Sequence, residues 1–596
     1  MKITLPAISR NALTISAFGL VACSQEPAPE TVAANNPAAD DTGICNDLYL
    51  TNGRFYSMAE LPAVEDGATQ SDFNSMRISG NRIAEIGDDL DPANCESINL
   101  QGSSVIPGFI DSHMHFIRAT LRPGYDTREL ELSRSIPEAM DMVAEKAEEM
   151  AAAGIPTDQW ITFVGGWDPI QWDENVIGST RDGDPTTVFP SVEQMDEAAG
   201  DYPFYIHLRS TEEAFTNSLG IARLNELATT AGGAVDPQIN EENGLVANST
   251  AAFNLIKTTS DPREQAIRVM RSFNSVGLTS VVDVGGSIRG MGAQYFSVFD
   301  DYETMKGLYA NDEMTIRVRG RVQGDLITPL QGYEDIVHEL VASFGSEDDS
   351  MFKIVGLGED LGNLEENRLQ ETIEMALSNG WTVGKHAARA ADIKAFHQAT
   401  LETGVTTRFI MEHSYPREEE RKLIADYGYE HTVAAQLAIH PFLGRGRAGT
   451  VCNGVPYRSL TEFGLLAGIG TDSTNAQSSN PWIHVYHMVT GLDVKGFASN
   501  AGGVLPGAGD NGEDIVCPDE RVSRAQAIQL YTKGSSWLAS SEDDYGTLEE
   551  GKLADLIVLN EDFFSDGVAD EDIIHMRSLL TVVDGKIVYR DESAPF

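Results

Sequence analysis

Eight short apolar segments, separated by stretches of helical periodicity, constrain the fold of this chain more than any other feature. Strands that alternate with helices form parallel sheets, because each helix returns the chain to the same edge. Eight such units close into a barrel. The expected strands are "SVIPGFIDSH" (104–113), "LTSVVDV" (278–284), "TIRVRG" (315–320), "FKIVGL" (352–357), "TVGKHA" (382–387), "TRFIMEH" (407–413), "TVAAQL" (432–437) and "AGIGTD" (467–472). The sequence therefore predicts an α/β protein built on a (β/α)8 TIM barrel.

The two ends of the chain follow a different pattern. Residues 43–103 and 541–596 alternate apolar and polar positions around Gly, Asn and Asp turns, which is typical of β-strands and hairpins. We expect both ends to pair into one composite β-sandwich, although two separate β caps would give the same pattern. The barrel then covers residues 104–540. Within it, residues 117–277 are too many for one helix and predict a long insertion after the first strand, over the barrel mouth where active sites form.

The first residues read as a targeting segment. Lys2 and Arg10 precede the apolar run "NALTISAFGLVA", which is too short for a comfortable membrane span and indicates a signal peptide over residues 1–22. The following "LVAC" resembles the lipobox of bacterial lipoproteins. That resemblance implies acylation of Cys23 and a lipid anchor in the outer membrane of a Gram-negative cell, facing the periplasm or the outside. Residues 23–42 would be a polar tether. A secreted protein with a chance cysteine is the alternative.

Four cysteines remain once Cys23 is set aside. An even number in an oxidising compartment fits two disulfides, and pairing by proximity in sequence gives Cys45–Cys95 and Cys452–Cys517. The sequence alone leaves all three connectivities open.

The charge of the chain excludes one class of partner. Asp and Glu number 91 against 42 Lys and Arg, for a net charge of −49. Such a surface repels nucleic acid and anionic lipid headgroups. We therefore expect a small-molecule substrate and no nucleic acid, while a homo-oligomer stays open.

The first predicted barrel strand ends in two histidines one residue apart. Residues i and i+2 of a strand point to the same face, so His113 and His115 converge on one point. Two neutral imidazoles suit a divalent cation. An HxH pair is also common among hydrogen-bonded core histidines, so by itself this motif does not decide between the two.

Four further residues in or at the ends of later predicted strands strengthen the metal hypothesis: Lys353, His386, His413 and Asp472. Taken singly, Lys353 could be a surface lysine, Asp472 a helix cap, and the histidines core residues. Their joint placement on strands four, five, six and eight favours one site at the barrel mouth.

With these residues in view, the chain resembles the amidohydrolase superfamily, in its amidohydrolase-3 or YtcJ-like group. The resemblance rests on "VIPGFIDSHMH", "GLTSVVD", the "GTD" strand and "GTLEEGKLADLIVL". It implies a binuclear centre of two divalent metal ions, with zinc expected. His113, His115 and Asp472 would bind one ion, His386 and His413 the other, and a carboxylated Lys353 would bridge both. The family commonly has Asp-Gly after the lysine strand, where this chain has Leu357-Gly358-Glu359, and this departure weakens the Lys353 assignment. Lys385, beside His386, is a rival for that role, although on a strand it would face away from its neighbour.

The resemblance also implies the reaction. A metal-bridging hydroxide would attack a non-peptide C–N bond, in an N-acyl compound or cyclic amide, and Asp472 would carry the proton to the leaving nitrogen. Deamination, or hydrolysis of a lactone or ester, could use the same site. A different class of function, a catalytically inactive surface binding lipoprotein, would be favoured by the loss of one ligand, and all six candidates are present. The sequence contains no GxSxG motif, which disfavours a serine hydrolase.

Several softer candidates could contact a substrate. They are Trp167 with Trp172, His207, Glu212 and Gln436. Each has an equally plain structural reading: the tryptophans and His207 as core residues, and Glu212 as a solvated helix position.

Overall fold

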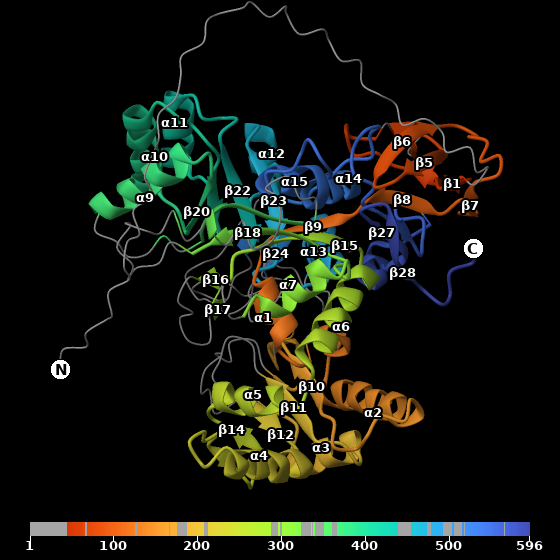
Figure 1. Cartoon of the computed structure of the whole chain (residues 1–596), viewed down its shortest axis with the longest axis vertical. Coiled ribbons are helices and arrows are strands. Elements are labelled where there is room, and N and C mark those ends of the chain that lie inside the picture. Colours follow the sequence, from red (N-terminus) through yellow and green to blue (C-terminus); the bar gives the residue numbers. More distant parts are fainter. Residues whose placement is uncertain are drawn as a thin grey trace, which may run out of the picture. The chain divides into compact units, whose positions relative to one another are not determined.

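The computed structural model confirms the parallel α/β barrel. Eight parallel strands follow one another in the order β23-β22-β21-β20-β19-β18-β15-β9 (Figure 1). Their bounds are β9 Phe109–Met114, β15 Leu278–Asp283, β18 Arg317–Val322, β19 Phe352–Leu357, β20 Thr382–His386, β21 Phe409–Glu412, β22 Val433–Ala438 and β23 Leu466–Gly470. These strands are largely buried, as expected for a parallel sheet covered by helices.

The structure describes residues 45–596, with gaps. The gaps fall at 63, 66–67, 125–127, 166, 168, 176–187, 208–212, 288–295, 298–300, 324–334, 336–337, 340–350, 360, 362–365, 439–454, 474–477, 493–502, 506–514, 518 and 566. Among the described residues, no helix combines the length and the apolar character needed to cross a bilayer.

Helices connect the barrel strands in the expected alternation. They are α6 Pro262–Ser275, α7 Glu303–Ala310, α9 Glu366–Ser378, α10 Ala390–Thr403, α11 Glu418–Tyr427, α12 Tyr457–Phe463 and α13 Pro481–Thr490, followed by α14 Arg524–Gln529, a π-helical turn Leu530–Gly534 and α15 Ser535–Leu538. Their starts follow local rules: Asp261 accepts hydrogen bonds from the first turn of α6, and Pro262 begins that helix. One large apolar cluster joins the helices to the strands.

The first predicted strand is in fact two strands. β8 (Ser104–Pro107) ends at Gly108, and β9 then enters the barrel. A side chain at Gly108 would lie 2.2 Å from Thr279 on the neighbouring strand, so this junction requires glycine. The predicted boundary at residue 104 therefore falls a few residues early.

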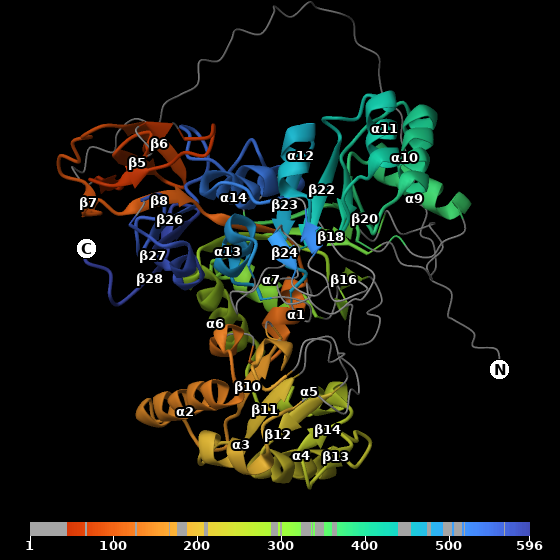
Figure 2. The same ribbon diagram turned by 180° about the vertical axis from the view of Figure 1, so that it is seen from behind.

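β8 belongs instead to a pair of sheets made from both chain ends, which we call the two-sheet unit (Figure 2). One sheet has the order β6-β5-β1-β7 and the other β2-β8-β26-β27-β28, and one apolar cluster lines both. The strands are β1 Leu48–Thr51, β2 Arg54–Phe55, β5 Ser75–Ser79, β6 Arg82–Gly87, β7 Glu96–Asn99, β26 Leu556–Leu559, β27 Ser578–Val583 and β28 Lys586–Arg590. β26 pairs antiparallel with β8 on one side and β27 on the other, so the end of the chain completes a sheet that the beginning starts.

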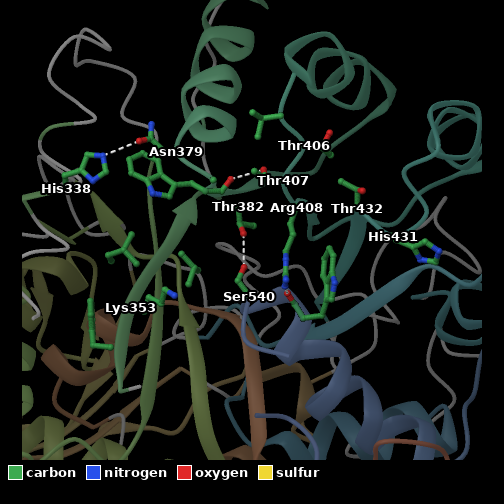
Figure 3. Close-up of a pocket in the computed structure, with 17 residues that line it drawn as sticks. His338, Lys353, Asn379, Thr382, Thr406, Thr407, Arg408, His431, Thr432 and Ser540 are labelled. Carbon is green, nitrogen blue, oxygen red and sulfur yellow. Dashed lines mark hydrogen bonds between the residues drawn. The ribbon is translucent and has the colours of Figure 1, made fainter. Parts of the chain in front are cut away.

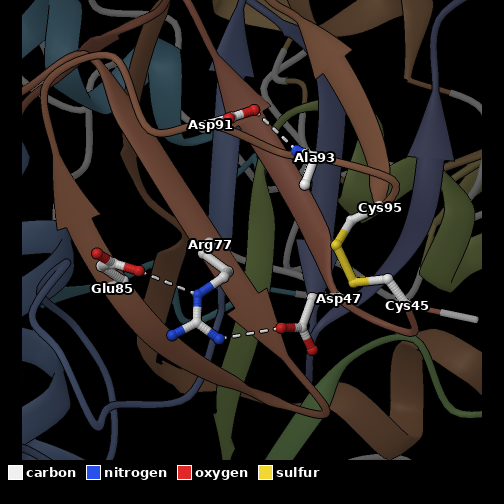
Figure 4. The surroundings of a disulfide bond; sticks show 7 residues. All are labelled: Cys45, Asp47, Arg77, Glu85, Asp91, Ala93 and Cys95. Atoms are coloured by element: carbon white, nitrogen blue, oxygen red, sulfur yellow. Dashed lines mark hydrogen bonds and ion pairs between the residues drawn. A yellow bond between two sulfur atoms is a disulfide. The ribbon is translucent and has the colours of Figure 1, made fainter. Parts of the chain in front are cut away.

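A disulfide joins Cys45 to Cys95 at the edge of this unit, beside an Arg77 that pairs with Asp47 and Glu85 (Figure 4). Cys452 lies outside the described residues, so the Cys452–Cys517 pairing stays a prediction.

A further five-stranded sheet, of order β10-β11-β12-β14-β13, is inserted between β9 and β15. Its strands are β10 Ile161–Val164, β11 Phe204–His207, β12 Ala214–Thr216, β13 Ile239–Asn240 and β14 Leu245–Val246. The connecting helices are α1 Phe116–Leu121, α2 Ile136–Ala152, α3 Val192–Ala199, α4 Ser218–Thr230 and α5 Ser249–Lys257 (Figure 1). α6, which the sequence placed inside the insertion, packs on β15 and the C-terminal strands.

Short pieces complete the described elements. Three two-stranded sheets are β3 Val64–Glu65 with β4 Ala68–Thr69, β16 Gly286–Ser287 with β17 Phe296–Ser297, and β24 Gly503–Leu505 with β25 Ile515–Cys517. Three 3-10 turns span Glu129–Leu132, Pro169–Gln171 and Asp570–His575.

Candidate metal centre

Six titratable side chains meet at the C-terminal ends of five barrel strands. They are His113 and His115 from β9, Glu359 just after β19, His386 at the end of β20, His413 just after β21, and Asp472 just after β23. Active sites of parallel barrels form at this end of the strands.

Four of these residues form a first, largely buried group: His113, His115, Glu359 and Asp472. The Nε2 atom of His115 lies 3.3 Å from Oδ1 of Asp472 and 3.6 Å from Oε1 of Glu359. The Nε2 atom of His113 lies 3.4 Å from Oε2 of Glu359 and 3.9 Å from Asp472. The donor atoms of the group all lie within 4.8 Å of one another, close enough to surround one ion.

Glu359 also belongs to a second group with His386 and His413. Its Oε2 atom lies 2.7 Å from Nδ1 of His386 and 3.0 Å from Nε2 of His413. The His386 side chain is 53% exposed, whereas that of Glu359 is 6% exposed. One buried carboxylate therefore lies between two sets of imidazoles.

The backbone at two of these residues adopts a conformation that non-glycine residues rarely use. His413 has φ of 49° and Asp472 has φ of 50°, both in the left-handed region, which costs about 1–3 kcal/mol at each position. Hydrogen bonds hold both residues: the His413 N–H donates to Oε1 of Gln436, and the Asp472 N–H donates to the carbonyl of His113. Gln436 therefore supports the backbone of a site residue, where the sequence suggested contact with a substrate.

The seam between the first and last barrel strands depends on side chains. Thr471 donates its backbone N–H (3.0 Å) and its hydroxyl (2.6 Å) to the carboxylate of Asp111. The Ser112 hydroxyl donates to the carbonyl of Ile469, and the His115 N–H donates to the carbonyl of Ser473. These bonds fix β9 against β23 and so bring Asp472 beside the two histidines of β9.

The electrostatics of the cluster favour a bound cation. Burial lowers the pKa of His413, but Asp472 and Glu359 outweigh burial and raise that pKa to about 9. The pKa values of Glu359 and Asp472 lie below their usual ranges despite burial, because histidines surround both carboxylates. The buried Nε2 atom of His113 makes no hydrogen bond among the described residues. Imidazoles and carboxylates in this arrangement fit a divalent metal ion.

The structure does not bring Lys353 to the centre. Lys353 is the second residue of β19, and Glu359 follows the end of that strand, so six residues of extended chain, roughly 20 Å, separate them. Glu359 occupies the position between the histidines that the sequence analysis gave to a carboxylated lysine. Lys385, the rival, lies beside the exposed His386 and donates to its carbonyl.

Lys353 instead lines a cavity of about 740 Å3 at the N-terminal ends of the strands (Figure 3). Its neighbours there include Trp381, Arg408 and Trp537. Arg408 is already paired with Glu542 and stacks over Trp537. The cavity thus lies at the end of the barrel opposite the cluster.

The softer candidates lie in cores or outside the described residues. Trp167 and Trp172 stack on each other, with ring centroids 5.0 Å apart, inside the apolar cluster of the inserted sheet. His207 is buried, with Nε2 3.1 Å from the Ser249 hydroxyl. Glu212 and Cys23 lie outside the described residues.

Comparison with known proteins decides the family. The profile of the Amidohydrolase family matches residues 96–589, most of the chain. The chain belongs to the amidohydrolase family. This amidohydrolase is 22% identical over 577 residues to an N-substituted formamide deformylase of Arthrobacter pascens, covering 88% of this chain and 96% of the relative. It is also 22% identical over 533 residues to a protein named putative amidohydrolase YtcJ of Bacillus subtilis (strain 168), covering 83% and 90%.

Solved structures show the same fold. A metal-dependent hydrolase of Pyrococcus horikoshii superposes with a TM-score of 0.53 at 18% identity, covering 88% of this amidohydrolase and 99% of the other chain. A triazine hydrolase variant gives a TM-score of 0.50 at 16% identity, covering 92% and 95%. At these identities the likeness establishes the barrel fold and no more.

Proposed function

We propose that this amidohydrolase hydrolyses non-peptide C–N bonds in small N-acyl compounds, with N-substituted formamides and cyclic amides as the first substrates to test. The observation that carries the proposal is the convergence of four histidines on Glu359 and Asp472 at the barrel mouth. The family and the formamide-hydrolysing relative support the choice of bond.

His113, His115, Asp472 and Glu359 would hold one divalent ion, and Glu359, His386 and His413 a second. Imidazole and carboxylate donors make zinc the expected ion. When bound, such ions lower the pKa of a water molecule and polarise the carbonyl of a substrate.

Asp472 is the residue best suited to move the proton. Its side chain is 25% exposed, so an incoming molecule can reach it, and its lowered pKa keeps it ionised near neutral pH. In this proposal a carboxylate oxygen of Asp472 accepts the proton of the attacking water and then donates it to the leaving nitrogen. His115, 3.3 Å from Oδ1, orients that carboxylate.

The test is a substrate panel on the full chain, stripped of metal and reloaded with Zn2+. N-substituted formamides, N-acyl amino acids and cyclic ureides are compared with lactones, esters and amine-bearing heterocycles. Zinc-dependent turnover of an amide or formamide supports the proposal. Turnover confined to esters or lactones, or release of ammonia from the heterocycles alone, would replace the proposed reaction.

Asp472→Asn separates catalysis from binding. We expect the variant to lose turnover while it still binds zinc, because His113, His115 and Glu359 remain to hold the ion, whereas an amide cannot accept the proton. Unchanged turnover would remove Asp472 from the mechanism. A wild-type chain that binds no zinc would favour a binding protein over an enzyme.

A further inference from the structure

A buried ion pair lies directly behind one of the site histidines. Glu412 is the last residue of β21, next to His413, and its side chain is fully buried. Its Oε2 atom lies 2.8 Å from Nδ1 of His113, and its Oε1 atom pairs with the guanidinium of Arg321 from β18. We propose that Glu412, held by Arg321, is a positioning residue that fixes His113 as a metal ligand. The inference rests on the metal centre of the proposed function.

The contact determines which nitrogen of His113 can bind a metal. An ionised carboxylate accepts hydrogen bonds and donates none, so the proton of a neutral His113 must sit on Nδ1. Nε2 then carries the lone pair. Nε2 is the atom that faces Glu359 and Asp472, and it makes no hydrogen bond among the described residues. The carboxylate thus selects the tautomer in which the donor lone pair points into the centre.

Arg321 holds Glu412 in one position. Both side chains have no exposed surface, and Arg321 also donates to the carbonyl of Leu538, so the guanidinium is anchored at a second point. Arg321 is a buried counter-charge in direct contact with the Glu412 carboxylate. A fixed, charged carboxylate is what an orienting role requires.

The neighbouring strand leaves room for this arrangement. A Cβ atom at Gly384 of β20 would lie 2.6 Å from Oε1 of Glu412 and 3.4 Å from the guanidinium of Arg321. Any side chain at Gly384 would therefore push the pair apart.

The second histidine group has no such support in the part of the chain that is described. The Nδ1 atom of His413 is buried and has no hydrogen-bond partner there, and His386 directs its Nδ1 toward Glu359. The positioning carboxylate therefore belongs to the ion site of His113.

The deciding variant is Glu412→Gln. Because Arg321 donates to the side-chain oxygen at this position, the amide NH2 of Gln would face Nδ1 of His113 and act as a donor. His113 would then carry its proton on Nε2, the nitrogen needed for the metal. The matched control is Asp555→Asn, which disrupts another buried arginine pair, Arg317–Asp555, at the opposite end of the barrel.

Zinc affinity is measured on metal-free full-length protein by competition with a chelator, with thermal unfolding of each variant as the folding check. We expect Glu412→Gln to weaken one of two zinc equivalents by about 10- to 100-fold. Asp555→Asn should lower the melting temperature and leave both affinities unchanged. If Glu412→Gln fails to fold, Arg321→Lys, which keeps the charge but loses the planar fork, should weaken the same equivalent.

The outcomes separate the two proposals. Wild-type protein that binds no zinc would overturn the metal centre itself. If the wild-type protein binds zinc and a folded Glu412→Gln or Arg321→Lys variant binds it with equal affinity, only the positioning role is overturned. If Asp555→Asn loses as much zinc affinity as Glu412→Gln, the positioning role is also overturned, because the loss would then result from general destabilisation.

Discussion

Glu359 is the residue on which the candidate centre depends. Its two carboxylate oxygens lie within 3.6 Å of ring nitrogens of four histidines from three strands. No other described side chain belongs to both groups. The two groups should therefore lose metal together when this carboxylate is changed.

Glu359→Gln tests that expectation against the alternative of Lys353. An amide is neutral and a weaker ligand, so we expect zinc content to fall by one equivalent or more and turnover to fall by more than about 100-fold. Lys353→Met is the control, and its zinc content and activity should match those of the wild type. The reverse pattern, with loss in Lys353→Met alone, would restore the lysine to the centre.

His487 provides a prediction on stability. It lies in α13 with Nδ1 3.2 Å from the carbonyl of Leu492, and burial lowers its pKa from 6.5 to about 4. As pH falls from 6.5 toward 4, the unfolded chain binds a proton that the folded chain does not bind. The free energy of unfolding should therefore fall across this window, by about 3 kcal/mol from this residue.

Urea unfolding at pH 7 and at pH 4 measures the effect of His487. His487→Gln, which can still donate to Leu492 but does not titrate, should lose about 3 kcal/mol less than the wild type between the two pH values. Equal losses in both proteins would show that His487 titrates alike in the folded and unfolded chains.

At the level of elements, the seam between β9 and β23 determines whether the centre assembles. The two strands lie side by side, but the seam is held by Asp111, Ser112 and Thr471 in addition to backbone bonds. Asp472 follows Thr471 directly, so the hydrogen bonds that position Thr471 at the seam also position Asp472 in the site.

Thr471→Val removes a hydroxyl without changing the shape of the side chain. We expect a loss of about 1–3 kcal/mol in unfolding free energy, because buried Asp111 loses a donor, together with weaker zinc binding. Thr382→Val, which removes a hydroxyl bonded to Ser540 at the other end of the barrel, should lower stability without changing zinc affinity. If Thr471→Val binds zinc as tightly as Thr382→Val and the wild type do, the seam does not determine the geometry of the site.

At the scale of the whole molecule, the barrel and the two-sheet unit form one folded body. Arg317 on β18 pairs with Asp555 at 2.9 Å and with Asp584 at 3.3 Å, so the barrel interior is tied to the loops beside the C-terminal strands. Neither part is expected to unfold without exposing that buried guanidinium.

We also propose that the mature chain is anchored through Cys23 by a lipid. Cys23→Ala should abolish incorporation of radiolabelled palmitate and move the protein from the membrane fraction to the soluble fraction. Cys517→Ser is the control and should keep its label. Palmitate labelling that persists in Cys23→Ala would end this proposal.

The sequence predicted the barrel and most of the site because both follow local rules. Strand-length apolar runs identify the barrel, and period-2 spacing places His113 and His115 on one face. Residue type points to Lys353, but position points to Glu359, because the other site residues lie at the ends of their strands and Glu359 does too.

The remaining features depend on distant partners. Arg317, Arg319 and Arg321 alternate along one strand and look like a solvated face, yet all are buried. Arg317 is paired with an aspartate 238 residues away, which no local pattern can reveal. In the sequence, Glu412 resembles a surface charge next to His413. Only the fold brings its carboxylate into contact with Nδ1 of His113.

The pairing of β8 with β26 has a consequence for biogenesis. On the ribosome, β8 is made some 450 residues before its partner β26, so one edge of β8 stays unpaired for most of the synthesis of the chain. A premature stop before Asp555 would remove β26 and both aspartates, so that edge would stay open and Arg317 would lack its partners. Such truncated products should aggregate or be degraded rather than persist as weakened enzymes.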